Sequence, residues 1–252
     1  MNNKCKPAAS GHLFNLHGTM GLMALACAAA PMASFAAEYV AGTTPEIVLM
    51  TGSSDGQTNT LSEAIAAYNT ANQTSYDVSS FNGGDLAAYA LVKEGDGTLV
   101  MDTAIQSYTG PIVIKDGVVQ CMCTEALGAD VDGSHVYVRN GATLWVDRQA
   151  IDVIVNGKTQ KQDSIFNQNR TLHIIGSGHN NQGALASRPF RPNHSYNQSG
   201  IYCKKIYLDG DALVMHPVWG YVANNLWLSG HTLSVYIRFI LPARPTPKRH
   251  GW

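Results

Sequence analysis

The chain has 252 residues, a formal net charge of −1 and only 14% charged residues. So few charges argue against a disordered polyelectrolyte and against a basic nucleic-acid-binding protein. Hydrophobic residues make up 45% of the chain and glycine occurs 24 times, so a sizeable core and many turns are expected. No nucleic-acid partner is expected.

Residues 1–36 have the order of a secretory signal. Lys4 and Lys6 precede an apolar, Ala-rich run. Small residues after this run indicate a cleavage site between Ala36 and Ala37. A membrane anchor and a lipoprotein attached through Cys27 are the alternatives. Residues 1–36 contain no acidic residue, so the exported chain would carry a net negative charge and would not attract phosphate backbones.

Three cysteines follow this signal: Cys121, Cys123 and Cys203. An oxidising compartment allows a disulfide from Cys203 to Cys121 or Cys123. The other interpretation is that these are small buried side chains. A metal site built on the Cys121-x-Cys123 pair is not expected, because no second pair of ligands is suitably spaced.

The first region after the signal, residues 37–94, is predicted to form an N-terminal cap with a helix near 60–69. Thr60 and Glu63 have the spacing of a capping box, and Leu61, Ile65 and Tyr68 form one apolar stripe. Because the helix is short, it must pack on another element to be stable.

Residues 95–241 contain a series of short apolar strands, and no helix is predicted among them. Most are interrupted by a glycine after a turn-forming residue, and Asp-Gly and Asn-Gly supply the positive φ that such bends require. The predicted turn glycines are Gly97, Gly117, Gly141, Gly157, Gly210 and Gly230.

A spacing of about 20–24 residues between several of these turns indicates a solenoid. We therefore predict an all-β, right-handed parallel β-helix, in which stacked coils share one core and the N-terminal helix covers the exposed strand edges. A β-sandwich is the alternative fold.

The segment from Gly95 to Gln120 resembles the passenger-associated repeat of bacterial autotransporters. It contains Gly95-Asp-Gly-Thr-Leu, then Tyr108-Thr-Gly, then Gly117-Val-Val. Val118 and Val119 replace the usual Thr-Leu, and the segments at 136–146 and 199–214 are similar to other passenger coils. The resemblance implies a β-helix that is exported through the outer-membrane translocation machinery and displayed at the cell surface.

Complete members of that family end in a C-terminal β-barrel, and the chain shows no such pattern after Val235. Pro242, Pro245 and Pro247 exclude a centrally paired strand, so residues 242–252 are interpreted as a disordered or aberrant tail. The chain is interpreted as a truncated passenger, located in the periplasm if the barrel is absent.

No catalytic, cofactor-binding or metal-binding residue is predicted. Acidic residues occur in two groups, which are interpreted as parts of polar turns. The first group is Asp130, Asp132, Asp147 and Asp152, and the second is Asp209 and Asp211. The Gly52-x-Ser54-x-Gly56 motif is interpreted as a loop, because no helix begins directly after the serine as a nucleophile elbow requires. Single solvated or packed histidines are expected at His135, His173, His179, His194 and His231.

The predicted function is a non-catalytic passenger-type β-helix for surface display or adhesion, with a glycan or a protein as partner. A polysaccharide lyase or hydrolase and a secreted structural protein are the alternatives. Aromatic residues that could stack on sugar rings are Trp145, Trp219, Tyr221 and Trp227, and packing between coils is the other role open to them.

Overall fold

The computed structural model describes residues 38–50, 54–146, 151–155, 158–162, 166–187, 201–215 and 223–236. The predicted signal and its cleavage site at Ala36 and Ala37, the tail at 242–252 and the residues Gly157, Asp147, His194, Trp219 and Tyr221 lie outside this part of the chain.

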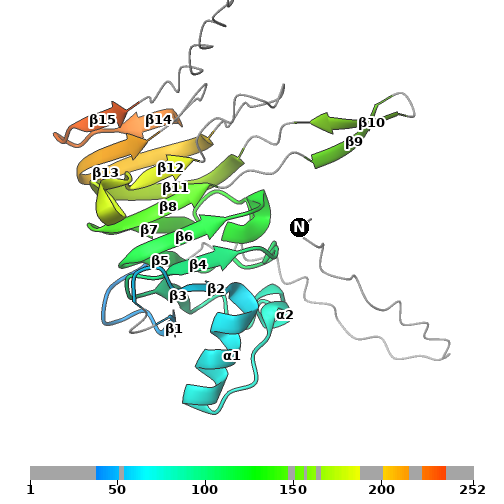
Figure 1. Cartoon of the computed structure of the whole chain (residues 1–252). Helices are drawn as coiled ribbons and strands as arrows, with labels where there is room; N and C mark the ends of the chain where they lie inside the picture. Colours follow the sequence, from blue (N-terminus) through cyan, green and yellow to red (C-terminus); the bar gives the residue numbers. More distant parts are fainter. Residues whose placement is uncertain are drawn as a thin grey trace, which may run out of the picture.

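One large sheet forms most of the molecule and has two halves (Figure 1). The first half contains β1 (Glu46–Leu49), β3 (Ala90–Lys93), β5 (Ile112–Ile114), β7 (His135–Val138), β11 (Phe166–Gly176), the start of β13 (Ile201–Met215) and β14 (Ala223–Trp227). The second half contains β2 (Thr58–Thr60), β4 (Thr98–Met101), β6 (Gly117–Cys121), β8 (Ala142–Val146), β12 (Leu185–Ser187), the end of β13 and β15 (Leu233–Tyr236).

The strands of both halves pair in parallel, and β13 joins the halves because it runs through both. The sheet curls so that inward residues of both halves, such as Leu91, Ile112, Leu99 and Val119, share one core. The predicted all-β parallel β-helix is therefore confirmed. The β-sandwich alternative is wrong, because a sandwich needs antiparallel pairing and the described part of this sheet has none.

The coils advance by about the expected period where no segment is inserted. Leu91 pairs with Ile112, and Ile112 in turn pairs with Val136, so both of these steps agree with the spacing of the turn glycines. The step from Val136 to its partner Leu172 is longer because the antiparallel hairpin of β9 (Ile151–Val155) and β10 (Lys158–Gln162) lies between the two strands.

The β-helix begins at Glu46 rather than at residue 95, because β1, β2 and β3 pair within the same sheet. Helix α1 (Leu61–Asn72) therefore follows the first two strands instead of preceding the first coil. It packs against β1, β2 and β4 at the N-terminal end of the stack (Figure 1), together with the short helix α2 (Val78–Asn82).

The predicted features of α1 are present. The Glu63 carboxylate accepts a hydrogen bond from the Thr60 backbone N–H at 2.7 Å, and the Glu63 N–H donates to Thr60 Oγ1 at 3.3 Å, which completes the capping box. Leu61 and Ile65 are buried and Tyr68 packs on the core, so the apolar stripe covers the end of the stack as expected.

Two edges of the β-helix differ in their connections. We call the edge where each coil passes from the first sheet half to the second the turn edge, and most of its connections between the strands are short. The opposite edge is the loop edge, and longer connections occupy it at 61–89, 102–111 and 122–134.

The predicted turn glycines all lie on the turn edge where they are described, but they differ in conformation. Gly117, Gly141 and Gly230 have positive φ, as predicted, whereas Gly97 and Gly210 do not. In the Gly95–Gly97 turn the positive φ is at Gly95. Gly210 lies within the continuous strand β13, where an added Cβ would meet Ile175 Cδ1 at 2.5 Å, so close approach rather than φ requires glycine there.

Replacing Gly117 with Ala is expected to destabilise the protein by about 2 kcal/mol more than replacing Gly230 with Ala. Both glycines have positive φ, so both variants carry the same backbone strain. At Gly117 the new Cβ would also lie 2.5 Å from the Gly97 carbonyl oxygen and 2.7 Å from Lys93 Nζ, whereas at Gly230 nothing lies within 4 Å. Urea denaturation of both variants measures the difference, and equal losses would contradict it.

Tyr108, the first residue of the Tyr108-Thr-Gly motif, is buried and links strands at the loop edge. The Tyr108 hydroxyl donates to the Tyr89 carbonyl oxygen at 2.8 Å and accepts from the Leu91 N–H at 3.0 Å. Burial raises the pKa of this hydroxyl well above its usual range, so it stays protonated. Gly110 is required because a Cβ there would meet the Tyr108 hydroxyl at 2.6 Å.

The cysteines do not form the bridge that the sequence allowed. Cys121 and Cys203 are buried free thiols, and burial raises the pKa of Cys203 to about 12. Cys123 is disulfide-bonded, but its bond joins neither of these two residues. The two free thiols pack in the core, so the interpretation as small buried side chains is correct for them.

Candidate functional site

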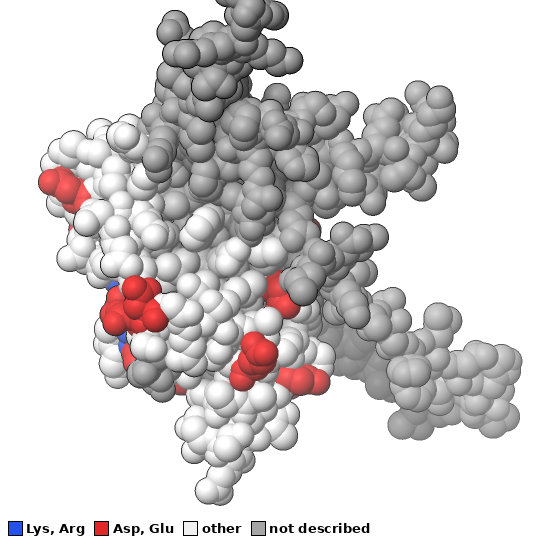
Figure 2. All heavy atoms as spheres, in the orientation of Figure 1, with Lys and Arg blue, Asp and Glu red and all other residues white. Residues whose placement is uncertain are grey.

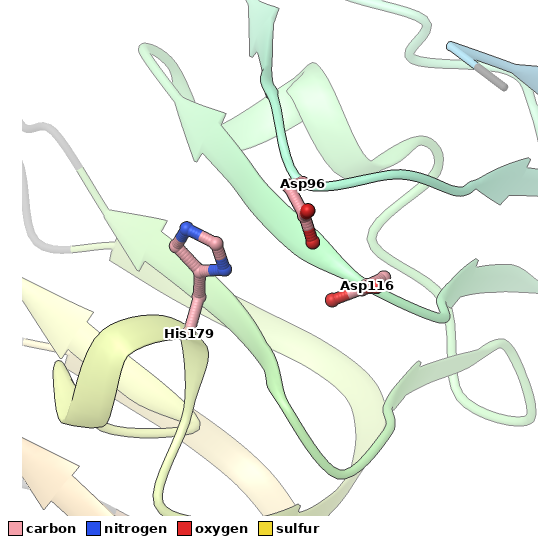
Figure 3. Close-up of side chains that lie close together, drawn as sticks. All are labelled: Asp96, Asp116 and His179. Carbon is pink, nitrogen blue, oxygen red and sulfur yellow. The ribbon is translucent and has the colours of Figure 1, made fainter. Parts of the chain in front are cut away.

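Two aspartates and a histidine meet on the turn edge (Figure 3). One potential ligand atom from each of Asp96, Asp116 and His179 lies within 4.8 Å of the others. Asp96 lies between β3 and β4, Asp116 lies between β5 and β6, and His179 begins the short 3-10 helix η2 (His179–Asn181) between β11 and β12. The cluster therefore unites residues from three coils.

Parallel stacking explains how the two aspartates come together. The strands on both sides of their turns are in register, since Lys93 pairs with Ile114 and Thr98 pairs with Val118. Equivalent turn positions of neighbouring coils therefore lie one above the other.

The loop that carries His179 is held against the preceding coil. Thr143 on β8 accepts a hydrogen bond from the His179 backbone N–H and donates one to the Gly183 carbonyl oxygen, both at 2.8 Å. Gly178 has positive φ, and a Cβ there would clash with Gly183. These contacts fix the backbone of the loop that carries His179.

A fourth residue, Asp55, orients the histidine ring. His179 Nε2 lies 3.3 Å from Asp55 Oδ1, and the Asn180 amide nitrogen lies 3.4 Å from the other Asp55 oxygen and 3.0 Å from the same ring nitrogen. The hydrogen bond from His179 is the main cause that holds the pKa of Asp55 below its usual range. The Asp55 carboxylate only accepts, so the contact with it requires the proton on Nε2, and the Asn180 amide nitrogen, which only donates, then binds Asp55 rather than the ring. In this tautomer Nδ1 keeps its lone pair.

A buried lysine lies beneath the same turns. Lys93 is 2% exposed, and its ammonium donates to the backbone oxygens of Glu94 at 3.0 Å and Asp116 at 3.2 Å, and to that of Gly95. Burial lowers the pKa of Lys93 to about 8, although Asp116 and Asp96 act in the opposite direction. The ammonium is therefore mostly charged at neutral pH and offsets part of the negative charge.

The sequence did not predict this cluster. His179 was expected to be a single histidine, and this expectation is wrong because it contacts Asp55 and lies beside two more carboxylates. His135 and His173 are not single either, since their ring nitrogens lie 3.1 Å apart and His173 also contacts Asp209. Asp96 and Asp116 each precede one of the predicted turn glycines. This shared position was the signal in the sequence from which their proximity could have been predicted.

Of the acids that were considered in the sequence, those whose side chains the structure describes have structural partners. Asp132 binds Lys205 at 2.8 Å and Asp130 binds the Asn169 side-chain amide at 2.9 Å, which supports their role in a polar turn between coils. Asp209 pairs with Arg139 at 3.4 Å across coils rather than forming a turn. Figure 2 shows small groups of acidic side chains among the mostly uncharged described residues of this face.

No protein-family model, curated protein or solved structure matches this chain. Among the described residues, no helix has the length and apolar character needed to span a membrane.

Aromatic side chains form a column on the outer surface of the first sheet half. Tyr137, His173, Tyr207 and Trp227 occupy one register position on β7, β11, β13 and β14. Their rings stack in this order with centroid distances of 4.5, 5.4 and 4.4 Å. Most ring faces are therefore covered by neighbouring rings rather than free for a sugar.

The aromatic strip that the sequence allowed is therefore only partly assembled. Trp227 belongs to this column, but Trp145 lies on β8 in the other sheet half, where its Nε1 is buried and has no hydrogen-bond partner. Trp227 stacks on Tyr207 of the neighbouring coil. Packing between coils, the other role considered for these rings, is therefore correct for Trp227.

His135 lies beside this column, with its ring centroid 5.3 Å from that of His173, and it predicts a pH dependence of stability. Burial, and secondly the neighbouring His173, lower the pKa of His135 below its usual value. A histidine with a lowered pKa opposes folding once the unfolded chain is protonated, so the free energy of unfolding should fall as the pH decreases below about 6.5. Unfolding curves between pH 7 and 5 should show a smaller decrease for His135→Gln. The control His231→Gln changes an exposed histidine and should retain the full decrease.

Proposed function

We propose that the chain is an exported, non-catalytic β-helix of the autotransporter-passenger type, which serves in surface display or adhesion. The observation that carries this proposal is the difference between the two edges of the β-helix. The longest connections leave from the loop edge, whereas most connections on the turn edge are short. In solenoids, insertions on one side commonly form the binding surface.

The hairpin β9–β10 is the most distinct of these insertions. It forms a two-stranded sheet of its own between β8 and β11 and extends away from the stack (Figure 1). Because its strands pair only with each other among the described strands, it can vary without disturbing the coils. This arrangement suits a scaffold that presents a loop to a glycan or a protein on a cell surface.

Export is tested first. The chain should leave the cytoplasm of a bacterial host and lose residues 1–36, so that its N-terminal sequence begins at Ala37. Retention of the intact chain in the cytoplasm would contradict export.

Adhesion is tested with a glycan array and with a panel of immobilised extracellular-matrix proteins. The purified chain should bind a defined member, and replacing 151–162 with a short Gly-Ser linker should weaken that binding at least tenfold. The control Asp211→Asn changes an exposed residue of the turn edge and should bind normally. No binding to any member, or equal binding by the linker variant, would contradict the assignment of the loop edge.

A carbohydrate-active β-helix is the second candidate, and the pair Asp96 and Asp116 favours it. Two carboxylates whose oxygens lie within 4.8 Å are near the spacing of about 5 Å at which retaining glycosidases use one carboxyl group as acid and the other as nucleophile. This candidate predicts that the chain releases reducing ends or unsaturated products from acidic polysaccharides, and that Asp116→Asn abolishes the release. A chain that leaves pectin and alginate intact would not support it.

A further inference from the structure

The turn edge carries a concentration of negative charge that the fold itself only partly neutralises. Asp55, Asp96 and Asp116 surround His179, and the Lys93 ammonium lies beneath Asp116. Three carboxylates and one ammonium leave a net charge of −2. A divalent cation would neutralise this charge.

His179 supplies an observation that is independent of the acids. Its side chain is only 10% exposed, and Nε2 lies 3.3 Å from the Asp55 carboxylate. Figure 3 shows one ring nitrogen turned toward the two carboxylates, and no group among the described residues forms a hydrogen bond with Nδ1. A histidine held by a carboxylate on one nitrogen, with the other nitrogen free, is the usual arrangement of a metal-binding histidine.

We propose that Asp96, Asp116 and His179 form a binding site for a first-row divalent metal ion of the zinc type, with Asp55 as the residue that positions the imidazole. Imidazole and carboxylate together suit zinc, whereas calcium and magnesium prefer oxygen ligands alone. Three protein ligands leave at least one coordination position for water or a partner.

The site would connect the coils that contain Asp96, Asp116 and His179. Because these residues come from different coils, a bound ion would link three levels of the stack on the edge opposite the loops. The inference concerns the turn edge alone, so it does not rest on the proposed adhesion function.

The test is zinc binding by the full chain after removal of metal with a chelator, measured by calorimetry. The chain should bind one Zn²⁺ through this site, and Asp116→Asn and His179→Gln should each lower the affinity at least tenfold. Asp55→Asn should lower it about 10- to 100-fold, as expected for a group that orients a ligand. Asp209→Asn is the matched control, because Asp209 belongs to the same edge but binds Arg139 and His173 instead.

Melting curves in chelator show whether each variant folds, and X-ray absorption of the zinc-loaded chain identifies the ligands independently of any variant. Nitrogen and oxygen ligands are expected. Zinc–sulfur distances of about 2.3 Å would overturn the proposal, because they would place zinc on cysteine. Unchanged affinity in both Asp116→Asn and His179→Gln, or tighter binding of Ca²⁺ than of Zn²⁺, would overturn it as well.

Discussion

Replacing Arg170 with Met should lower the free energy of unfolding by about 3 kcal/mol, measured by urea denaturation. Arg170 is 0% exposed, and its guanidinium donates to the backbone oxygens of Ala129 at 3.0 Å, Gly110 at 3.3 Å and Tyr108 at 2.6 Å. Burial lowers its pKa to about 10, so the group remains charged at neutral pH.

The size of the expected loss follows from the carbonyl groups that would lose their donor. A buried acceptor without a partner costs about 1–3 kcal/mol. The Tyr108 oxygen keeps a second hydrogen bond from the Ala129 N–H, and the variant no longer desolvates a cation, so the three costs do not add in full. Methionine fills much of the same volume and therefore leaves a small cavity.

Arg139→Met is the matched control for this variant. Arg139 forms an ion pair with Asp209 at 3.4 Å and lies over the Tyr137 ring, but its side chain is 37% exposed. A partly exposed pair contributes no more than about 1 kcal/mol. Equal losses in the two variants would show that the buried hydrogen bonds of Arg170 do not stabilise the loop edge.

Replacing Ile65 with Asp, alone or together with Tyr68→Asp, should destabilise the protein by at least about 4 kcal/mol and cause aggregation. Ile65 is 3% exposed and lies in the core with Leu61, at the N-terminal end of the stack. A carboxylate in this position cannot be solvated, so the helix must leave the strands that it covers. The uncovered strand edges can then pair with other molecules.

Light scattering and thermal melting measure both effects. Ala66→Asp introduces the same charge on the exposed side of α1 and should change stability by less than about 0.5 kcal/mol. An Ile65→Asp variant that stays monomeric and melts at the normal temperature would show that α1 is not required as a cap.

Local sequence patterns were enough to predict α1 and most of the strands. The capping box and the spacing of Leu61, Ile65 and Tyr68 depend on residues that are close in the chain, so the helix could be recognised. The coil period was recognisable at Gly97 to Gly117 for the same reason. The strands β1 and β2 were not assigned to the β-helix, because the long segment that contains α1 and α2 separates them from β3 and β4.

The amino-acid sequence by itself determined the class of fold, because short apolar strands separated by regularly spaced turn dipeptides bury their apolar faces when coils stack on one another. The tertiary structure alone decided which polar residues meet. Asp96 and His179 lie far apart in the chain, and Arg170 binds carbonyl groups 41 to 62 residues before it. Such pairs depend on the register between coils and on the length of each inserted loop, and neither quantity is a local property of the sequence.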